Sequence, residues 1–385
     1  MAQMDAEAIV VGGGLVGLAA ALAVSKAGLS TIHLAPRAPA DRRTSALMMP
    51  SVEYLRSANI IGSPEQYGHA LKRIRIIDAT SRLLRAPESL FDASEIGLEA
   101  FGWNFPNARL LEALQSAKGS DSLLAARTSM LTAFEIDDKG PLLTLDNGQQ
   151  LRAPLVVGAD GKKSLIRSSA GFRAKESSFT QAALVCDLEL RRELGSTSVE
   201  FHYPNGPFTL VPAGGRNANL VWIDDQRTLK EIQAAGKERL AAAFAEKSQR
   251  LFGAVSLSSP AYVFPLSTMS VDKAGARGVV LVGEAAHAFP PIGAQGLNLG
   301  LRDIADLEAA LAVGNRNNGW ADRISQDYSA RRSSDLARTG GMVDALFRSL
   351  LTEMLPAQAL RAGGLWALKL APRLRRHAFA VGMGR

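Results

Sequence analysis

The first part of the chain changes from a short apolar run to a helical apolar pattern and back to a short apolar run. AIVV at 8–11 ends at three consecutive glycines. Leu15, Leu18, Ala19 and Leu22 then recur at helical spacing, and the pattern stops at Gly28. STIHLA at 30–35 follows as another short run. The order predicts a strand, a helix and a second strand, which together form a βαβ unit.

The turn between that first strand and the helix carries Gly12, Gly14 and Gly17. Glycines at this spacing permit a tight turn, close approach of a pyrophosphate and packing of the helix on the strand. The acid that usually binds an adenosine ribose is missing, because the second strand ends in LAPR at 34–37. Loss of such a charged hydrogen bond costs about 1.5 to 3 kcal/mol, or roughly 10- to 100-fold in affinity. We predict a weakened dinucleotide site; a tight turn that binds nothing is the alternative.

Single predicted strands follow first, and then a group of strands that favours an antiparallel sheet. LKRIRII at 71–77 and LLTL at 142–145 predict strands, the second within a hairpin, and LVVGADG at 155–161 predicts a buried strand that ends in Asp160 and Gly161. Between about 180 and 265 the runs QAALVCDLEL, SVEFHYP, PFTLVPA and NANLVWID favour an antiparallel sheet, interrupted by a helical stretch near 229–246. A second domain is therefore expected to be inserted in the first.

A further buried strand, GVVLVG, begins at residue 278. A single acid, Glu284, follows it at the junction with the next element. Leu297, Leu301, Ile304, Leu307 and Leu311 then predict a helix. The whole pattern favours an α/β fold with an inserted antiparallel domain.

The composition is that of an ordinary globular chain. The chain has 385 residues, a length sufficient for two domains. Its content of 47% apolar and 21% charged residues is typical of a globular protein. One cysteine excludes an internal disulfide, and the five histidines lack metal-ligand spacing, so we expect no metal. The N-terminus lacks a signal-peptide pattern and no apolar run approaches about 20 residues, which favours a cytoplasmic protein.

The net charge of +7 is concentrated near the C-terminus. Residues 346–385 contain seven Lys or Arg and one acid, a net of +6, so a broad nucleic-acid-binding face is not expected elsewhere. Leu365, Trp366, Leu368 and Leu370 lie among these basic residues. The mixture is typical of an amphipathic segment at an anionic membrane surface. A solvated helix docked on the body of the protein is an equal alternative.

Three motifs stand in order: the glycine turn at 12–17, GADGKKSLIR at 158–167 and VGEAAHAFPPIGAQGLNLG at 282–300. Together they resemble the group A flavoprotein monooxygenases, the family of para-hydroxybenzoate hydroxylase. Within that family the chain is similar to the aromatic hydroxylases of ubiquinone biosynthesis. This second resemblance rests on DRRTSAL at 41–47, TQAALV at 180–185, GPFTLVP at 206–212, LVW at 220–222, the stretch 328–335 and GLWALKLAP at 364–372.

The resemblance implies three structural parts. A Rossmann-like FAD-binding domain of the GR2 type would comprise residues 1–70, 100–178 and 266–345. A mainly antiparallel β-sheet domain that binds the substrate would comprise 71–99 and 179–265. A basic amphipathic helical segment would comprise 346–385.

The resemblance also implies contacts with FAD. Gly12, Gly14 and Gly17 would face the pyrophosphate at a helix N-terminus, where amides and the dipole favour anions. Arg43 would contact the ribityl and phosphate part, with Asn107 or Arg109 as a further polar contact. Asp160 would approach FAD and the nicotinamide cofactor. Gly283 and Glu284 hold the place of a Gly-Asp pair whose acid binds a ribitol hydroxyl.

The flavin ring would lie beside the proline-rich bend that precedes the helix. Amides of Gly296, Leu297 and Asn298 would face the flavin pyrimidine, where the reduced ring is negative. Pro291, Gly296 and Leu297 therefore form the expected ring environment, and no acid or base is assigned.

The implied reaction needs no protein nucleophile, because the flavin carries the chemistry. NAD(P)H would reduce FAD, O₂ would form a C4a-hydroperoxide in a pocket closed to water, and a phenolic ring would attack its distal oxygen. The expected substrate is a polyprenylated phenol of ubiquinone biosynthesis. Such a lipid suits peripheral contact with the inner face of the membrane.

Two other functions stay open. The same chemistry could act on a soluble phenol or secondary metabolite. A family member that has lost its cofactor could instead be a scaffold in a biosynthetic complex, and the departures at Ala35 and Glu284 favour this reading. His33, Cys186 and His287 are expected to be packed structural residues.

Overall fold

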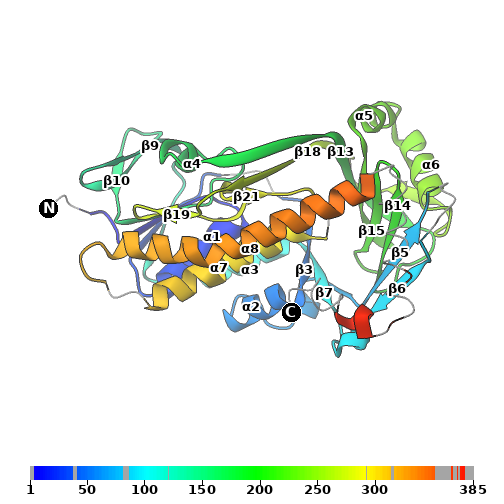
Figure 1. The fold of residues 1–385 in the computed structure, drawn as a ribbon, viewed down its shortest axis with the longest axis horizontal. Helices are drawn as coiled ribbons and strands as arrows, with labels where there is room; N and C mark the ends of the chain where they lie inside the picture. The colour runs from blue at the N-terminus through cyan, green and yellow to red at the C-terminus, as the bar shows by residue number, and fades with distance from the viewer. Residues whose placement is uncertain are drawn as a thin grey trace.

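The computed structural model describes residues 4–37, 41–80, 86–119, 121–291, 293–313, 316–351, 366, 371 and 373–377. A parallel sheet with its helices occupies one end of the molecule, and a large mainly antiparallel sheet occupies the other (Figure 1). The long helix α8 (Trp320–Leu351) runs from the first part toward the second. The predicted combination of an α/β domain and an antiparallel domain is confirmed.

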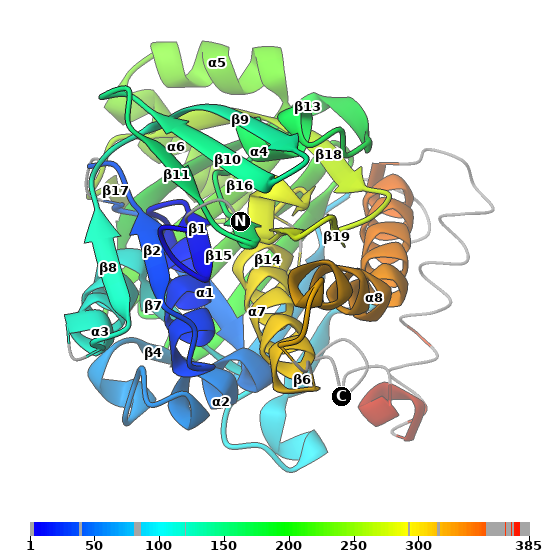
Figure 2. The ribbon, with the colours of Figure 1, turned by 90° about the vertical axis from the view of Figure 1, so that its left-hand side faces the viewer.

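The strands of the parallel sheet are buried, which explains their continuous apolar runs. In the order β19-β20-β12-β1-β2-β8 they are β19 (Gly275–Ala276), β20 (Val279–Leu281), β12 (Leu155–Gly158), β1 (Ala8–Val11), β2 (Thr31–Leu34) and β8 (Leu124–Arg127), of which only β19 is antiparallel. Helices α3 (Asn107–Gly119), α1 (Leu15–Lys26) and α7 (Gln295–Val313) lie side by side on one face, and α8 follows α7 (Figure 2). The meander β9 (Leu131–Asp137), β10 (Gly140–Leu145) and β11 (Gln150–Arg152) lies on the other side with α4 (Leu165–Ser169).

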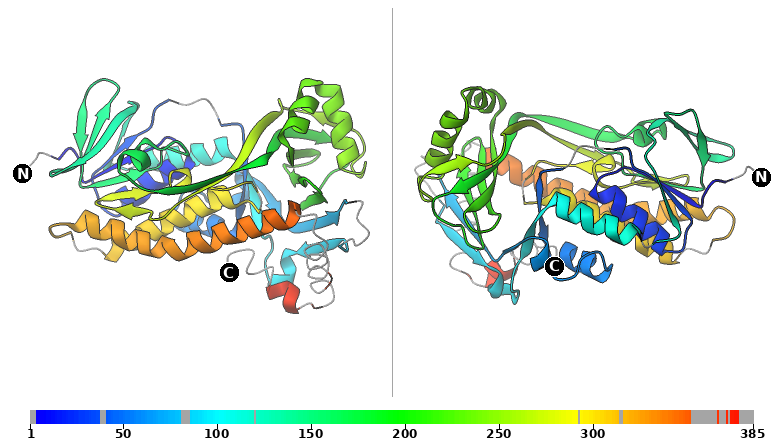
Figure 3. Two further views of the ribbon diagram at one scale, coloured as in Figure 1. Left: turned by 45° about the horizontal axis from the view of Figure 1, so that its top comes forward. Right: turned by 180° about the vertical axis from the view of Figure 1, so that it is seen from behind.

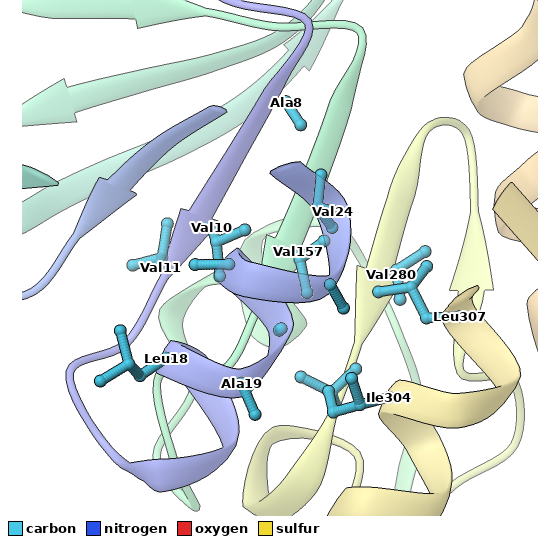
Figure 4. Packing of buried hydrophobic residues seen from close by; sticks show 14 of the residues in the cluster. Ala8, Val10, Val11, Leu18, Ala19, Val24, Val157, Val280, Ile304 and Leu307 are labelled. Atoms are coloured by element: carbon cyan, nitrogen blue, oxygen red, sulfur yellow. The ribbon is translucent and has the colours of Figure 1, made fainter. Parts of the chain in front are cut away.

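The core between this sheet and its helices is tightly closed. Val10, Val157 and Val280 of neighbouring strands lie beside Ala19 of α1 and Ile304 of α7, and all five are at most 1% exposed (Figure 4). Burial of one such branched side chain contributes about 1.5 to 3 kcal/mol. The packed core fixes the sheet edge from which the predicted site loops depart.

The large sheet has the order β21-β18-β13-β16-β15-β14-β5-β6, and β17 also pairs with β13. The strands are β21 (His287–Ala288), β18 (Tyr262–Val271), β13 (Ala174–Leu190), β16 (Asn217–Asp225), β15 (Gly206–Pro212), β14 (Thr197–Tyr203), β5 (Arg73–Asp78), β6 (Ser89–Asp92) and β17 (Val255–Leu257). One face packs Leu184, Phe208 and Trp222 into a cluster with α5 (Gln226–Ala234) and α6 (Lys237–Lys247). The predicted single helical stretch is two helices, because Gly236 adopts a φ of 90° between them.

Strands β13 and β18 run through both parts of the molecule (Figure 3). Their register shifts between Ser178 and Ala182, whose partners are Ser267 and Pro265. The predicted domain boundaries at 178/179 and 265/266 fall at this irregularity, and the division into domains stays a prediction. A separate three-stranded sheet, β3 (Thr44–Met48), β7 (Gly102–Pro106) and β4 (His69–Leu71), lies beside α2 (Met49–Ser57).

Candidate cofactor site

The glycine turn before α1, the Gly283 turn and helix α7 meet at the carboxyl edge of the parallel sheet, where open α/β sheets bind their ligands. Val16, at the start of α1, is the side chain around which they pack. A methyl group added to Gly283 would lie 3.0 Å from Val16, and one added to Gly300 of α7 would overlap Val16 and lie 3.7 Å from the Cα of Gly283. These small residues allow the first turn of α1, the Gly283 turn and α7 to converge.

The glycine turn has the backbone form that its sequence predicts. Gly12 has a φ of 141°, and a Cβ there would overlap the carbonyl oxygen of Ala159. A Cβ on Gly17 would overlap the carbonyl oxygen of Gly12. Gly14 precedes α1, and a Cβ there would meet no described atom within 4 Å. No side chain caps the first turn of α1 at Gly14, which leaves its amides available to an anion.

His33 supports this turn from β2, as expected for a packed residue. It is 1% exposed, its Nε2 lies 2.8 Å from the carbonyl oxygen of Gly12, and its Nδ1 lies 3.2 Å from Nζ of Lys118. Burial lowers the pKa of His33 to about 4, although the Gly12 hydrogen bond opposes the shift. The ring is therefore neutral at pH 7, with Nε2–H donating to Gly12.

We expect this histidine to make the fold sensitive to acid. The unfolded chain binds a proton near pH 6.5 and the folded chain only near pH 4, so stability falls as the pH drops through this window. The loss attributable to His33 is about 3 kcal/mol. Urea unfolding from pH 7.5 to 3.5 should show this additional loss in the wild type relative to His33→Gln. Parallel curves would contradict it.

A polar cluster lies at the start of β3. The Asp41 carboxylate accepts hydrogen bonds from Arg43 at 2.8 and 2.9 Å and from Nδ2 of Asn107 at 2.9 Å. Oγ of Ser45 donates to Oδ1 of Asn107 at 2.7 Å. Burial alone raises the pKa of Asp41, but the hydrogen bonds from Arg43 and Asn107 outweigh it and lower the pKa to about 2. Asp41 was not among the predicted contacts, although it was part of the motif used for the resemblance.

Glu284 lies at the open end of the Gly283 turn. Its side chain is exposed, whereas Gly283 and Ala285 on either side are buried. The hydrogen bond from Arg43 to Asp41 raises the pKa of Arg43, and the charge of Glu284 acts in the same direction. The structure thus brings Glu284 into the electrostatic field of Arg43 although 241 positions separate them in the sequence.

We expect Glu284→Asp to bind FAD at least as tightly as the wild type, because the related motif has the shorter acid at this position. Glu284→Ala should weaken binding roughly 10- to 100-fold through loss of a charged hydrogen bond. Titration of apoprotein followed by quenching of flavin fluorescence measures both. Weaker binding by the aspartate variant would show that the pocket is built around the longer side chain.

Two other predicted contacts have structural partners. Asp160 accepts a hydrogen bond from Oγ of Ser164 at 2.5 Å and one from the N–H of Ile166 at 3.2 Å, so its carboxylate closes the loop before α4. Arg109 lies on the exposed side of α3 and donates to the carbonyl of Gln66 at 3.1 Å. Their roles toward a cofactor stay predictions.

The start of α7 combines open backbone with packed side chains. Gly296 and Pro291 are exposed, and a Cβ on Gly296 would meet no described atom within 4 Å. The side chain of Leu297 lines a small apolar cavity with leucines of α1, α2 and α3, so its backbone amide is the group left for a ligand. The side chain of Asn298 instead joins α7 to β3, bonding the carbonyl of Ala46 and the N–H of Met48, both at 2.9 Å.

Sequence reasoning missed a buried charged cluster behind these loops. Asp303 of α7 and Arg332 of α8 are at most 1% exposed, and Oδ1 of Asp303 lies 2.7 Å from Nε of Arg332. Asp306 and Asp335 each lie 2.8 Å from Arg332 as well. His287 joins the cluster through Asp303, which agrees with the expectation that it is packed. The stretch 328–335, which served above only as evidence for the family resemblance, contains Arg332 and Asp335 and was the one sequence feature that could have pointed to this cluster.

The arrangement suits a dinucleotide. An open helix N-terminus can hold a pyrophosphate, and the acids and Arg43 beside it can bind a polyol chain. The glycine cradle admits the backbone approach that such a ligand needs. Among the described residues, no group of three His, Cys, Asp or Glu could hold a metal.

The fold and the candidate site are therefore those of an α/β protein that binds a dinucleotide. The sequence model described as "FAD binding domain" matches residues 5–339. The chain belongs to this family and is an FAD-dependent aromatic monooxygenase. An NAD(P)H co-substrate is typical of the family.

Two curated relatives match the whole chain. It is 29% identical to the ubiquinone hydroxylase UbiL of Rhodospirillum rubrum, covering 100% of this chain and 90% of the relative. It is 27% identical to the 3-demethoxyubiquinol 3-hydroxylase of Escherichia coli, covering 100% of both. Among solved structures, p-nitrophenol 4-monooxygenase PnpA from Pseudomonas putida has a TM-score of 0.81 at 19% identity, over 100% of this chain and 99% of that one. The last match shows a shared fold.

Proposed function

We propose that the protein hydroxylates the aromatic ring of a polyprenylated ubiquinone precursor. The names of the two curated relatives that match along the whole chain support this substrate class. The observation that carries the proposal is the convergence of the glycine turn, the Gly283 turn and α7 on Val16. FAD, when bound, would accept electrons from NAD(P)H and activate O₂ for transfer of one oxygen atom.

The residues of this chain would bind and orient the cofactor. The first amides of α1, at Gly14, would hold the pyrophosphate. Arg43 and Glu284 would bind the polyol chain, and the backbone at Gly296 and Leu297 would donate to the electron-rich edge of the ring. All of these groups are backbone amides or charged side chains at one edge of the sheet. They would bind and orient the cofactor, and none of them would form or break a covalent bond.

Valines on one face of the large sheet, beside the polar Thr209 and Asn219 of the same face, can contact an apolar substrate. Val185, Val221 and Val211 lie on the face opposite the one covered by α5 and α6, as strand alternation requires. Val211 belongs to the same apolar cluster as Ala46 and Met48, whose backbone Asn298 binds. This face is thereby joined to the start of α7, where the ring would lie.

We also propose peripheral contact with an anionic membrane through the basic tail. Most of residues 346–385 lie outside the described residues, so the two readings of this segment stay open. Arg375 lies 2.7 Å from Glu95, a contact that favours docking for this part, whereas Arg373 and Arg376 are exposed. In the part of the chain that the structure describes, no helix is long and apolar enough to span a bilayer.

Flotation with anionic liposomes tests the membrane contact. Full-length protein should float, and Arg373→Gln/Arg376→Gln should float less, because each basic residue near the surface contributes about 1 kcal/mol. Equal flotation of the two proteins, or none of either, would remove the argument.

Complementation of strains that lack a hydroxylase at each ring position tests the substrate. Rescue of one strain would support the proposal and name the carbon. A purified protein that carries flavin and rescues none would favour the soluble-phenol alternative. A colourless protein that cannot take up added FAD would favour the scaffold.

A further inference from the structure

One carboxylate, that of Asp303, contacts both ends of the turn that carries Glu284. Its Oδ2 accepts a hydrogen bond from the backbone N–H of Gly283 at 2.7 Å and lies 2.7 Å from Nε2 of His287, which must carry the proton because a carboxylate only accepts. Asp303 is 0% exposed, so both bonds are shielded from water. Glu284 therefore projects from a turn whose two ends are bound to one oxygen atom.

Arg332 stabilises the charge of that carboxylate. Its Nε lies 2.7 Å from Oδ1, the oxygen that does not contact the turn. A buried carboxylate without a partner is strongly unfavourable, and the cation of Arg332 offsets this. Asp306 and Asp335 both lie 2.8 Å from Nη1 of Arg332, at the far end of its guanidinium. The acceptor of the turn is thus anchored to α8 as well as to α7.

The turn has little freedom of its own. Gly283 has a φ of 58°, and a Cβ on it would lie 3.0 Å from the side chain of Val16 of α1. The ring of His287 stacks on Phe289, with 6.1 Å between centroids and 10° between planes. Phe289 leads into the bend before α7, so Asp303 fixes the turn relative to the same helix whose first amides belong to the proposed ring site.

We propose that Asp303 is a positioning residue for FAD: it holds the Gly283–Glu284 turn in its binding position before the cofactor arrives. The inference rests on the proposed assignment of this turn to FAD. A segment that is already ordered does not have to be ordered on binding, and this raises affinity. Loss of the contact should therefore weaken the binding of FAD but leave the pyrophosphate site at the glycine turn intact.

Asp303→Asn separates these roles. The amide oxygen can face the two donors of the turn or it can face Arg332, and in either case its NH₂ group opposes a donor on the other side. Asp306→Asn is the matched control, because Asp306 pairs with the same Arg332 and its amide oxygen can still accept from it. Gly283 and His287 both donate to Asp303, whereas Asp306 accepts from Arg332.

The experiment compares FAD with ADP, which carries the pyrophosphate but lacks the ribityl chain and the ring. Apoproteins of the wild type, Asp303→Asn and Asp306→Asn are titrated with FAD by fluorescence quenching and with ADP by calorimetry, and thermal melting verifies folding. We expect Asp303→Asn to bind FAD at least 10-fold more weakly and ADP within twofold of the wild type. Asp306→Asn should bind both FAD and ADP with affinities within twofold of those of the wild type.

Wild-type affinity for FAD by Asp303→Asn would overturn the inference, and so would equal losses for FAD and ADP, which indicate a general structural role. Failure of the wild type to bind FAD would instead remove the proposed function. If Asp303→Asn does not fold, amide hydrogen exchange of wild-type apoprotein decides. Residues 283–287 should be protected before FAD is added, and protection that arises only with FAD would contradict a preformed turn.

Discussion

Replacement of Gly17 by alanine is expected to lower the affinity for FAD by about 100-fold or more. The new methyl group would overlap the carbonyl oxygen of Gly12, which is backbone and cannot rotate away. Helix α1 must then move from the turn, and its first amides lose their alignment with the pyrophosphate. Loss of two charged hydrogen bonds at about 1.5 to 3 kcal/mol each gives a reduction of this size.

Fluorescence quenching with apoprotein measures the affinity, and urea unfolding measures the accompanying loss of stability, about 1 to 3 kcal/mol for an overpacked contact. Gly62→Ala is the matched control. A Cβ on Gly62 would meet no described atom within 4 Å, and its φ is not positive, so binding should be unchanged. If Gly17→Ala binds FAD as the control does, the glycine turn is not the pyrophosphate site.

The glycine turn was predictable because one of its constraints is local. A Cβ on Gly17 would overlap the carbonyl oxygen of Gly12 in the same turn, so the spacing of these two glycines reports the geometry. The antiparallel sheet was predictable for a similar reason, since alternation reports one covered face. The parallel pairing of β5 with β14 could not be predicted. Arg73 pairs with Thr197, and the residue pattern of neither strand indicates which strand lies beside it.

The charged cluster behind the site lay beyond such reasoning. Asp303 falls between Leu301 and Ile304 in a helix whose apolar positions explain its period, and an acid among them predicts solvent exposure. Its burial arises only when α8 brings Arg332 to it from 29 positions away. The length of β13 was hidden similarly, because AKESSFT at its start has no alternation that marks a strand.

Replacement of Arg332 by methionine is expected to lower the free energy of unfolding by about 3 to 5 kcal/mol, because it leaves the charge of Asp303 buried without its cation. Arg331→Met is the control on the same helix. Arg331 is 35% exposed and pairs only with Asp327 among the contacts described, so its loss should matter by about 1 kcal/mol or less. Urea unfolding of the three proteins at pH 8 measures both effects.

The pH dependence identifies the cause of the Arg332 effect. Without Arg332, burial penalises the charged carboxylate of Asp303 relative to its protonated form. The folded state then binds the proton first, and the deficit of Arg332→Met should shrink between pH 8 and pH 5. A constant deficit would assign the loss to packing of the long side chain. Asp303→Leu/Arg332→Met should recover part of the stability, because it removes both charges from the interior together.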